Sequence, residues 1–330
     1  MSTSVLATDN LVLHFKKNRS LIDLLAGKPP QAVKALNGVS LDLKKGETLG
    51  IVGESGCGKS TLARAIAGLY KPQSGDIQFH GVSTSSNKGA ALREYNRRVQ
   101  MIFQDPYSSL NPRLRVGDML REALSVHNMR PPEGIEERIN ELLDLVRLPR
   151  DAADKLPHEF SGGQRQRIAI ARALSVEPEV LIADELVSAL DVSVQAQVVN
   201  LLLSLQDDLG LTVLFVAHDL RLVRHVSHRV AVIYLGSVVE IGSASGLFAE
   251  PKHPYSQALL SAAPSLDPDE KGNQIVLSGE LPSPLNIPSG CAFHSRCPMA
   301  EPICRQTKPM LRGHPESGQV ACHLVDPTHN

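Results

Sequence analysis

Apolar and polar positions near the start of the chain alternate with a period of two. Residues 35–52 contain short alternating runs broken by Asn-Gly and Lys-Gly turn signals, and they end in the apolar segment Thr48–Val52. This pattern predicts a β-rich start that finishes in a strand. A glycine-rich loop follows at once, and residues 60–69 then have a helical composition. The sequence therefore predicts a strand, a glycine loop and a helix in immediate succession.

The middle of the chain has the period of an amphipathic helix. Apolar residues recur on one helical face over Val116–Leu124, and again over Ile135–Val146 after the breaker Arg130-Pro131-Pro132. Spacings of three, four and seven residues place such side chains on one side of a helix. We therefore expect a helical insertion at about residues 106–175, between two halves of the main sheet.

From about residue 160 the pattern alternates between helices and buried strands. The predicted strands are Val180–Ala183, Thr212–Ala217 and Val230–Leu235, and the predicted helices are Gln164–Leu174 and Ser193–Leu209. Strands that alternate with helices form a parallel sheet with right-handed crossovers. The predicted fold class is α/β, with a parallel-sheet core, an antiparallel β start and a helical insertion.

The composition limits the classes of partner. The chain has 330 residues, with 34 Lys+Arg against 35 Asp+Glu and a formal net charge of −1. A general nucleic-acid binder would usually be basic, so this balance argues against nucleic acid as a partner. No apolar run approaches the roughly 18 residues that a membrane span requires, and the polar first ten residues lack a secretion signal. We expect an intracellular protein with no transmembrane segment of its own.

Residues Gly53–Ser60 read Gly-Glu-Ser-Gly-Cys-Gly-Lys-Ser, which fits the phosphate-loop pattern between a strand and a helix. Glycines allow the backbone to wrap a polyphosphate with several N–H groups pointing inward. The N-terminus of the following helix adds a partial positive charge. Lys59 would reach the β- and γ-phosphates, and the Ser60 hydroxyl would coordinate Mg²⁺.

The predicted strand at Val180–Ala183 is followed by two acidic residues, Asp184 and Glu185. An acid at the carboxyl end of a parallel strand lies at the ligand-binding edge of the sheet. Asp184 suits a direct or water-mediated role at Mg²⁺, and Glu185 is placed to orient or deprotonate an attacking water. Alone, such a pair is more often a solvated loop, but together with the phosphate loop it predicts a hydrolytic site.

Ser161-Gly162-Gly163-Gln164-Arg165, 23 residues before Asp184, resembles the signature motif of the ATP-binding cassette (ABC) ATPases. Further positions resemble the other motifs of that family, in the same order along the chain. They are Phe15 as an aromatic that stacks on adenine, Gln104 as the Q-loop, Ser188-Ala189-Leu190-Asp191 as the D-loop and His218 as the switch histidine. The resemblance implies a P-loop NTPase fold, with one ABC cassette over residues 1–245.

The resemblance also implies roles for single residues. It implies catalytic roles for Glu185, His218 and Gln104, and Mg²⁺ contacts from Ser60, Gln104 and Asp184. Each ATP would lie between the phosphate loop of one subunit and the signature of another, so that hydrolysis releases a closed dimer. The residues implied in ATP binding are Phe15, Gly53, Ser55, Gly56, Cys57, Gly58, Lys59, Ser60, Thr61, Gln104, Ser161, Gly162, Gly163, Gln164 and Asp184.

The chain departs from the family at one position. The family usually has proline after the catalytic glutamate, whereas here the residue is Leu186. Proline would fix φ there and leucine does not, so the departure leaves open the backbone setting of Glu185. Because Lys59, Glu185 and His218 are intact, we expect activity rather than an inactive regulatory cassette.

Residues 103–112, together with 253–260, 279–284 and 291–298, carry a narrower resemblance, to the ATPase subunits of dipeptide/oligopeptide ABC importers. It implies a heterodimer of two related ATPases beneath two membrane permeases, at the cytoplasmic face of the plasma membrane, with an extracytoplasmic peptide-binding protein as a further partner. Residues 107–112 would then receive a permease. The alternative is a soluble ABC ATPase of translation or DNA repair, but such proteins carry two cassettes or a long coiled coil. The sequence of this chain does not identify the transported solute, because the ATPase subunit does not bind it.

Four cysteines, Cys291, Cys297, Cys304 and Cys322, lie in the last forty residues with intervals of 5, 6 and 17 residues. Four thiolates can hold either Zn²⁺ or an iron–sulfur cluster; the absence of C-x2-C knuckles lowers the case for zinc, and the resemblance implies a [4Fe–4S] cluster. The remaining alternative is that the four cysteines are free thiols and bind no metal. Because the tail at residues 246–330 has few periodic apolar positions, we expect the cluster to be its main staple and changes to the cysteines to spare the phosphate loop.

Overall fold

The computed structural model of the chain describes residues 4–16, 31–105, 109–262, 275, 277, 279–314 and 318–325, which form two β-sheets. The first is antiparallel, with the strand order β2-β1-β4-β5. Its strands are β1 (Ser4–Lys16), β2 (Ala32–Lys44), β4 (Ser74–Phe79) and β5 (Val82–Ser83). The predicted antiparallel β start is therefore confirmed.

The second sheet has the order β11-β12-β10-β9-β3-β8-β7-β6. The five strands from β9 to β6 are parallel, whereas β10, β12 and β11 pair antiparallel at the other side. The strands are β3 (Thr48–Val52), β6 (Val99–Ile102), β7 (Val180–Asp184), β8 (Thr212–Val216), β9 (Arg229–Tyr234), β10 (Ser237–Ser243), β11 (Arg312–His314) and β12 (Gly318–Val320). The predicted parallel core is confirmed, with strand limits within one residue.

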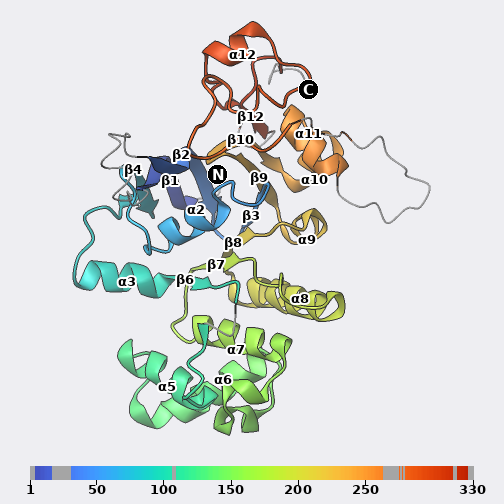
Figure 1. Ribbon diagram of the computed structural model, residues 1–330. Helices are drawn as coiled ribbons and strands as arrows, with labels where there is room; N and C mark the ends of the chain where they lie inside the picture. Colours follow the sequence, from blue (N-terminus) through green and yellow to red (C-terminus); the bar gives the residue numbers. More distant parts are fainter. Residues whose placement is uncertain are drawn as a thin grey trace, which may run out of the picture.

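Helices cover both faces of this sheet and form a separate lobe. The lobe comprises α5 (Val116–Val126), α6 (Ile135–Leu145) and α7 (Gly162–Leu174), and it lies at the end of the molecule opposite the tail (Figure 1). Short 3₁₀ turns join these helices at Pro132–Gly134, Arg150–Asp154 and Pro157–Glu159. The other helices are α2 (Lys59–Ile66), α3 (Ala90–Arg98), α8 (Val192–Leu209), α9 (Leu220–Val226), α10 (Ala244–Ala249), α11 (Pro254–Ser261) and α12 (Pro302–Gln306). In the described ranges, no helix combines the length and apolar character needed to cross a membrane.

The central strands are apolar throughout because both of their faces are buried. In β7, Val180 and Ile182 belong to one core cluster with α2 and the antiparallel sheet, whereas Leu181 and Ala183 belong to the other, with α7 and α8. Successive side chains of a strand point to opposite faces, so a doubly covered sheet requires a continuous apolar run. This is why short runs without alternation predicted the strands correctly.

The tail shares the core of the main sheet. The fully buried side chains of Tyr255 and Phe293 pack on Tyr234 of β9, with ring centroids 4.7 and 5.3 Å from that of Tyr234. The tail strand β12 pairs with β10, where Val320 faces Glu240. The expectation that the tail depends on a metal cluster as its main staple was therefore wrong, because apolar packing and strand pairing already hold it.

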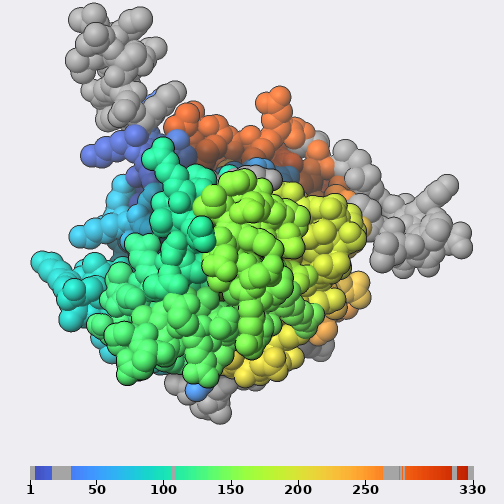
Figure 2. Space-filling model, turned by 90° about the horizontal axis from the view of Figure 1, so that it is seen from below, coloured from blue at the N-terminus to red at the C-terminus, as the bar shows by residue number. Residues whose placement is uncertain are grey.

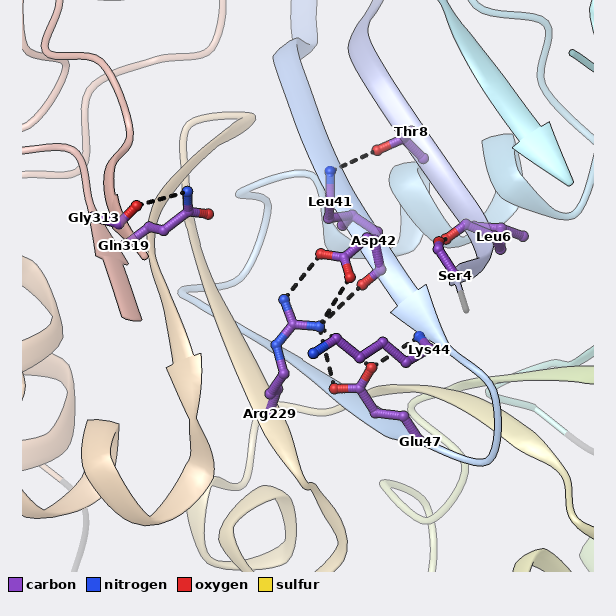
Figure 3. Close-up of polar contacts among 10 residues, drawn as sticks. All are labelled: Ser4, Leu6, Thr8, Leu41, Asp42, Lys44, Glu47, Arg229, Gly313 and Gln319. Carbon is purple, nitrogen blue, oxygen red and sulfur yellow. Dashed lines mark hydrogen bonds and ion pairs between the residues drawn. The ribbon is translucent and has the colours of Figure 1, made fainter. Parts of the chain in front are cut away.

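A buried ion network joins the two sheets. Arg229 of β9 points toward Asp42 of β2 and Glu47, with nitrogen–oxygen distances of 3.0 and 3.3 Å (Figure 3). The side chains of Arg229 and Glu47 are only 8% and 7% exposed. A charge taken out of water at this depth is tolerated only when its partner is present.

We expect Arg229→Ala to lower the free energy of unfolding by about 3–5 kcal/mol, because it leaves the Glu47 carboxylate buried without its cation. The measurement is urea denaturation followed by circular dichroism. Arg150→Ala is the matched control, since Arg150 and Asp144 form a pair whose side chains are 66% and 51% exposed. Water screens the two charges of such an exposed pair, so its loss should change stability little. Equal losses in both variants would contradict the role given to the buried network.

Candidate functional site

Residues 53–58 form the turn between β3 and α2, and Lys59 and Ser60 begin α2, as predicted. Gly53 has φ +151°, and a Cβ there would lie 2.2 Å from the carbonyl oxygen of Ile233. Gly58 has φ +108° at the N-cap of α2, and a Cβ there would lie 2.4 Å from the Ala35 carbonyl oxygen. Only glycine fits either position, so these two residues set the path of the loop.

Lys59 is buried, and its ammonium is held by the loop itself. Its Nζ donates to the carbonyl oxygens of Gly53 at 2.8 Å and Glu54 at 3.1 Å. Since Lys59 begins α2, its charge adds to the positive end of that helix. The loop thus places a cation and a helix N-terminus together, which is the arrangement that anions occupy.

Asp184 faces the start of α2 from the end of β7. Its Oδ1 accepts a hydrogen bond from the Ser60 hydroxyl at 2.8 Å, while its Oδ2 is buried without a hydrogen-bond partner. Burial raises the pKa of the Asp184 carboxyl, and the hydrogen bond from Ser60 opposes that shift. A buried carboxylate oxygen with a free lone pair beside a serine hydroxyl is a donor set that fits Mg²⁺.

Glu185 lies beside Gln104, which follows the neighbouring strand β6 by two residues. The Gln104 side-chain amide donates to Glu185 Oε2 at 2.6 Å. Glu185 itself has φ +49°, and its N–H donates to the Val216 carbonyl oxygen of β8 at 2.8 Å. A residue before proline is pushed toward extended conformations, whereas Leu186 imposes no such restriction. The left-handed backbone of Glu185 answers the question that Leu186 raised in the sequence.

The signature segment caps α7. The Ser161 hydroxyl accepts from the Gln164 N–H at 3.3 Å, and the Gln164 side chain accepts from the Ser161 N–H at 3.0 Å, which makes a capping box. Gly163 lies against α8, where a Cβ would be 2.3 Å from Val194 Cγ1. The signature therefore needs glycine at 163 for close packing, while Ser161 remains exposed.

The remaining predicted residues lie around this centre. His218 is exposed just after β8, and Phe15 is 37% exposed with its ring edge-on to Tyr70 at 5.2 Å. Cys57 is buried in the loop, and burial raises the pKa of its thiol. Ser55 and Gly56 are exposed, and Thr61 follows Ser60 in α2. The described contacts thus join Ser60 to Asp184 and Gln104 to Glu185.

Three residues that meet at the phosphate loop, Glu54, Tyr255 and Arg296, were not predicted from the sequence. Glu54 is bound by Arg296 through paired contacts of 2.8 and 3.0 Å, and its N–H donates to the Tyr255 hydroxyl at 2.8 Å. The tail therefore contacts the phosphate loop directly, although 242 residues separate Arg296 from Glu54 in the sequence. Tyr255 belongs to a motif that the sequence did display, but no spacing rule connects residue 255 or 296 with residue 54.

The four tail cysteines gather in one region. Burial raises the pKa of the Cys291 thiol to about 11, and the thiols of Cys304, Cys322 and Cys297 add to that rise. Cys304 is buried and the other three are half-buried. Within the part of the chain that the structure describes, however, no three Cys, His, Asp or Glu side chains are arranged to hold one metal ion. The geometry gives the predicted iron–sulfur or zinc site no support.

Comparison with known proteins extends over both parts of the chain. Residues 36–188 match the family described as "ABC transporter", and residues 239–304 match the family described as "Oligopeptide/dipeptide transporter, C-terminal region". The chain is 51% identical over 302 residues to the putative oligopeptide transport ATP-binding protein YkfD of Bacillus subtilis, covering 91% of this chain and 92% of that protein. It is 50% identical over 303 residues to the oligopeptide transport ATP-binding protein OppF of Salmonella typhimurium, covering 91% and 90%.

Solved structures similar to the chain are ATP-binding cassettes. The structure of cbiO1 from Clostridium perfringens, part of the ABC transporter complex cbiONQ, has a TM-score of 0.63 and 30% identity, covering 75% of this chain and 92% of that one. A dimeric post-hydrolysis structure of the cassette MJ0796 bound to ADP and Pi has a TM-score of 0.62 and 28% identity, covering 72% and 98%.

We expect Gly163→Ala to destabilise the protein by about 1–3 kcal/mol, because the new methyl group meets Val194. Val194→Ala removes the opposing Cγ1, so the double variant should lose less stability than the sum of the single variants. Gly134→Ala is the control, since a Cβ there meets nothing closer than 3.8 Å. Thermal unfolding of the four variants checks this, and strictly additive losses would speak against the contact.

Proposed function

The chain belongs to the ABC transporter ATPases and carries the C-terminal region of the oligopeptide/dipeptide transporters, and from this premise we propose that it hydrolyses ATP to power the import of di- or oligopeptides through a membrane ABC transporter. The observation that carries the proposal is the meeting of Lys59, Ser60, Asp184 and Glu185 at one edge of the parallel sheet. At this edge Lys59 would bind a polyphosphate, Ser60 and Asp184 would bind a divalent cation, and Glu185 would bind a water.

The proposed mechanism uses the described contacts. The phosphates of ATP replace the carbonyl oxygens of Gly53 and Glu54 as acceptors for Lys59. Ser60 and Asp184 would hold Mg²⁺ together with Gln104, and that ion would neutralise charge on the phosphates. Glu185 takes a proton from the attacking water, and the amide of Gln104 orients its carboxylate. The family resemblance assigns His218 a catalytic role as the switch histidine.

We place the second half of each ATP site on a partner ATPase. The exposed Ser161 at the N-terminus of α7 is free to approach a phosphate of another subunit, as helix N-termini do. The two halves would then close around ATP and open after hydrolysis. We propose a related ATPase of the same family as that partner.

We also propose that the helical lobe faces two membrane permeases, with a peptide-binding protein on the far side of the membrane. The lobe forms most of the face seen in Figure 2, with α8 at its edge. Ser109–Pro112 begins the lobe, where Arg172 of α7 donates to the Ser109 carbonyl oxygen at 2.7 Å. Residues 106–108 of the predicted docking segment lie outside the described residues. The match of residues 239–304 to the transporter C-terminal region favours this function over a soluble ATPase of translation or DNA repair.

We expect Glu185→Gln to abolish steady-state ATP hydrolysis while preserving ATP binding. Glutamine has nearly the same shape but cannot accept the proton of the attacking water, so the closed ATP-bound dimer should accumulate. The measurement is phosphate release by the assembled transporter, alongside gel filtration of the chain with ATP. Glu137→Gln, at an exposed position of α6, is the matched control and should hydrolyse ATP normally.

Lys59→Ala separates binding from chemistry. Removing the ammonium takes a charge away from the phosphates, so ATP affinity itself should fall. Hydrolysis at the unchanged rate in Glu185→Gln would remove the proposed general base. Unchanged ATP affinity in Lys59→Ala would remove the proposed phosphate loop.

For the tail we propose a [4Fe–4S] cluster on Cys291, Cys297, Cys304 and Cys322, with zinc as the alternative. Support comes from the family resemblance and from the gathering of the four cysteines in one region of the tail, where burial raises the pKa of the Cys291 and Cys297 thiols and neighbouring thiols add to that rise. The described geometry does not hold a metal, so the proposal requires the sulfurs to move together on loading. Such a group would cross-link the tail and take no part in hydrolysis, since ATP hydrolysis needs no electron transfer.

Anaerobically purified protein should accordingly be brown and absorb broadly near ~400 nm, as thiolate-ligated iron does. Each single Cys→Ser variant of the four should lose the colour, whereas Cys57→Ser, in the phosphate loop, should keep its iron. The measurements are the iron and zinc content of the protein and titration of its free thiols. Colourless protein with one zinc would replace the cluster by zinc, and colourless protein with freely titrating tail thiols and no metal would end the proposal.

A further inference from the structure

Among the described residues, the hydrogen bonds and ion pairs between the tail and the phosphate loop all reach Glu54. Arg296 binds the Glu54 carboxylate through two parallel hydrogen bonds, with Nη1 at 2.8 Å from Oε2 and Nη2 at 3.0 Å from Oε1. The Arg296 side chain is 9% exposed and that of Glu54 is 28% exposed. A forked guanidinium–carboxylate pair fixes orientation as well as charge, so it differs from an ordinary surface ion pair.

Tyr255 holds the backbone of the same residue. Its hydroxyl accepts the Glu54 N–H at 2.8 Å, and its ring is fully buried against Tyr234 and Phe293. His253 fixes the start of α11 by accepting the Tyr255 N–H at 3.0 Å through Nδ1. With the Lys59 ammonium and the Cys57 N–H on its carbonyl oxygen, Glu54 has all of its polar groups engaged, and two of its four partners come from the tail.

The charge of Glu54 matters because of where it lies. It follows Gly53 directly in a loop whose remaining features, the Lys59 ammonium and the N-terminus of α2, favour anions. A carboxylate at this place opposes the binding of a polyphosphate over a short range. The guanidinium of Arg296 neutralises it from the side of the tail.

We propose that Arg296 is a positioning residue for nucleotide binding, which acts by neutralising and orienting Glu54 so that the docked tail sets the ATP affinity of the phosphate loop. The inference rests on the proposed role of residues 53–60 as the ATP site. By linkage, ATP should in turn strengthen the docking of the tail by the same factor.

Removing each charge of the pair separately and then both together tests the proposal. The ATP affinity of each full-length variant is measured by titration with a fluorescent ATP analogue. Arg296→Gln should weaken binding by about tenfold, and more at low salt, because Glu54 is left as an uncompensated anion. Glu54→Gln should bind ATP as tightly as the wild type or more tightly, since Arg296 is then an uncompensated cation. The double variant should return to within about threefold of the wild type.

A merely structural role gives a different pattern. If Arg296 only glues the tail in place, both single variants and the double variant should lose affinity alike, and this outcome would overturn the proposal. Arg296→Lys keeps the charge without the fork, so it should bind ATP more tightly than Arg296→Gln but less tightly than the wild type, and it remains informative where Arg296→Gln does not fold. Arg305→Gln, at an exposed position of α12, is the matched control and should leave affinity unchanged.

Lys59→Ala separates failure of the inference from failure of the proposed function. If Lys59→Ala weakens ATP binding while the Arg296 and Glu54 variants do not differ from the wild type, the phosphate loop stands and the inference fails. If Lys59→Ala also leaves binding unchanged, residues 53–60 are not the ATP site and both fail. Hydrogen exchange over residues 291–298 with and without ATP reads the reciprocal effect, and unchanged protection there would contradict the coupling.

Discussion

The register of three parallel strands is the constraint on which the site depends. Ile51 of β3 and Asp184 of β7 both pair with Val216 of β8, which lies between them. The three strands therefore end level with one another, and the loops that follow them meet at one edge. Because both faces of these strands are buried, a slip by one residue would turn every apolar side chain to the wrong core. Apolar packing thus fixes the position of the polar chemistry.

At that edge the polar groups have partners that a ligand can replace. Lys59 binds carbonyl oxygens of its own loop, and one carboxylate oxygen of Asp184 is buried without a hydrogen bond. A buried polar atom without a partner costs free energy, so such an atom at a sheet edge marks a place where a cation belongs. Glu185 adds a left-handed backbone that costs about 1–2 kcal/mol. These two energetically unfavourable features lie at the site where ATP hydrolysis is proposed to occur.

The tail belongs to the same structural unit as the cassette. Tyr255 and Phe293 complete the core beneath β9, and β12 extends the main sheet beyond β10. The two motifs that looked like subfamily markers thus carry specific contacts: one places Tyr255 against the backbone of Glu54, and the other places Arg296 against its carboxylate. The tail, which has few periodic apolar positions, thus supplies two side chains that contact the phosphate loop.

The sequence by itself determined the local elements and the chemistry of each motif. Apolar runs located β3, β7, β8 and β9, and the glycines and acids identified the phosphate loop and the Asp184-Glu185 pair, because these signals depend on spacings within a few residues. Tertiary structure alone decided which distant segments meet. The ion pair of Arg296 with Glu54, 242 residues apart, and the shared core of the tail follow from packing of the whole chain. No local pattern encodes them, since loop closure over such lengths leaves no periodic trace in the sequence.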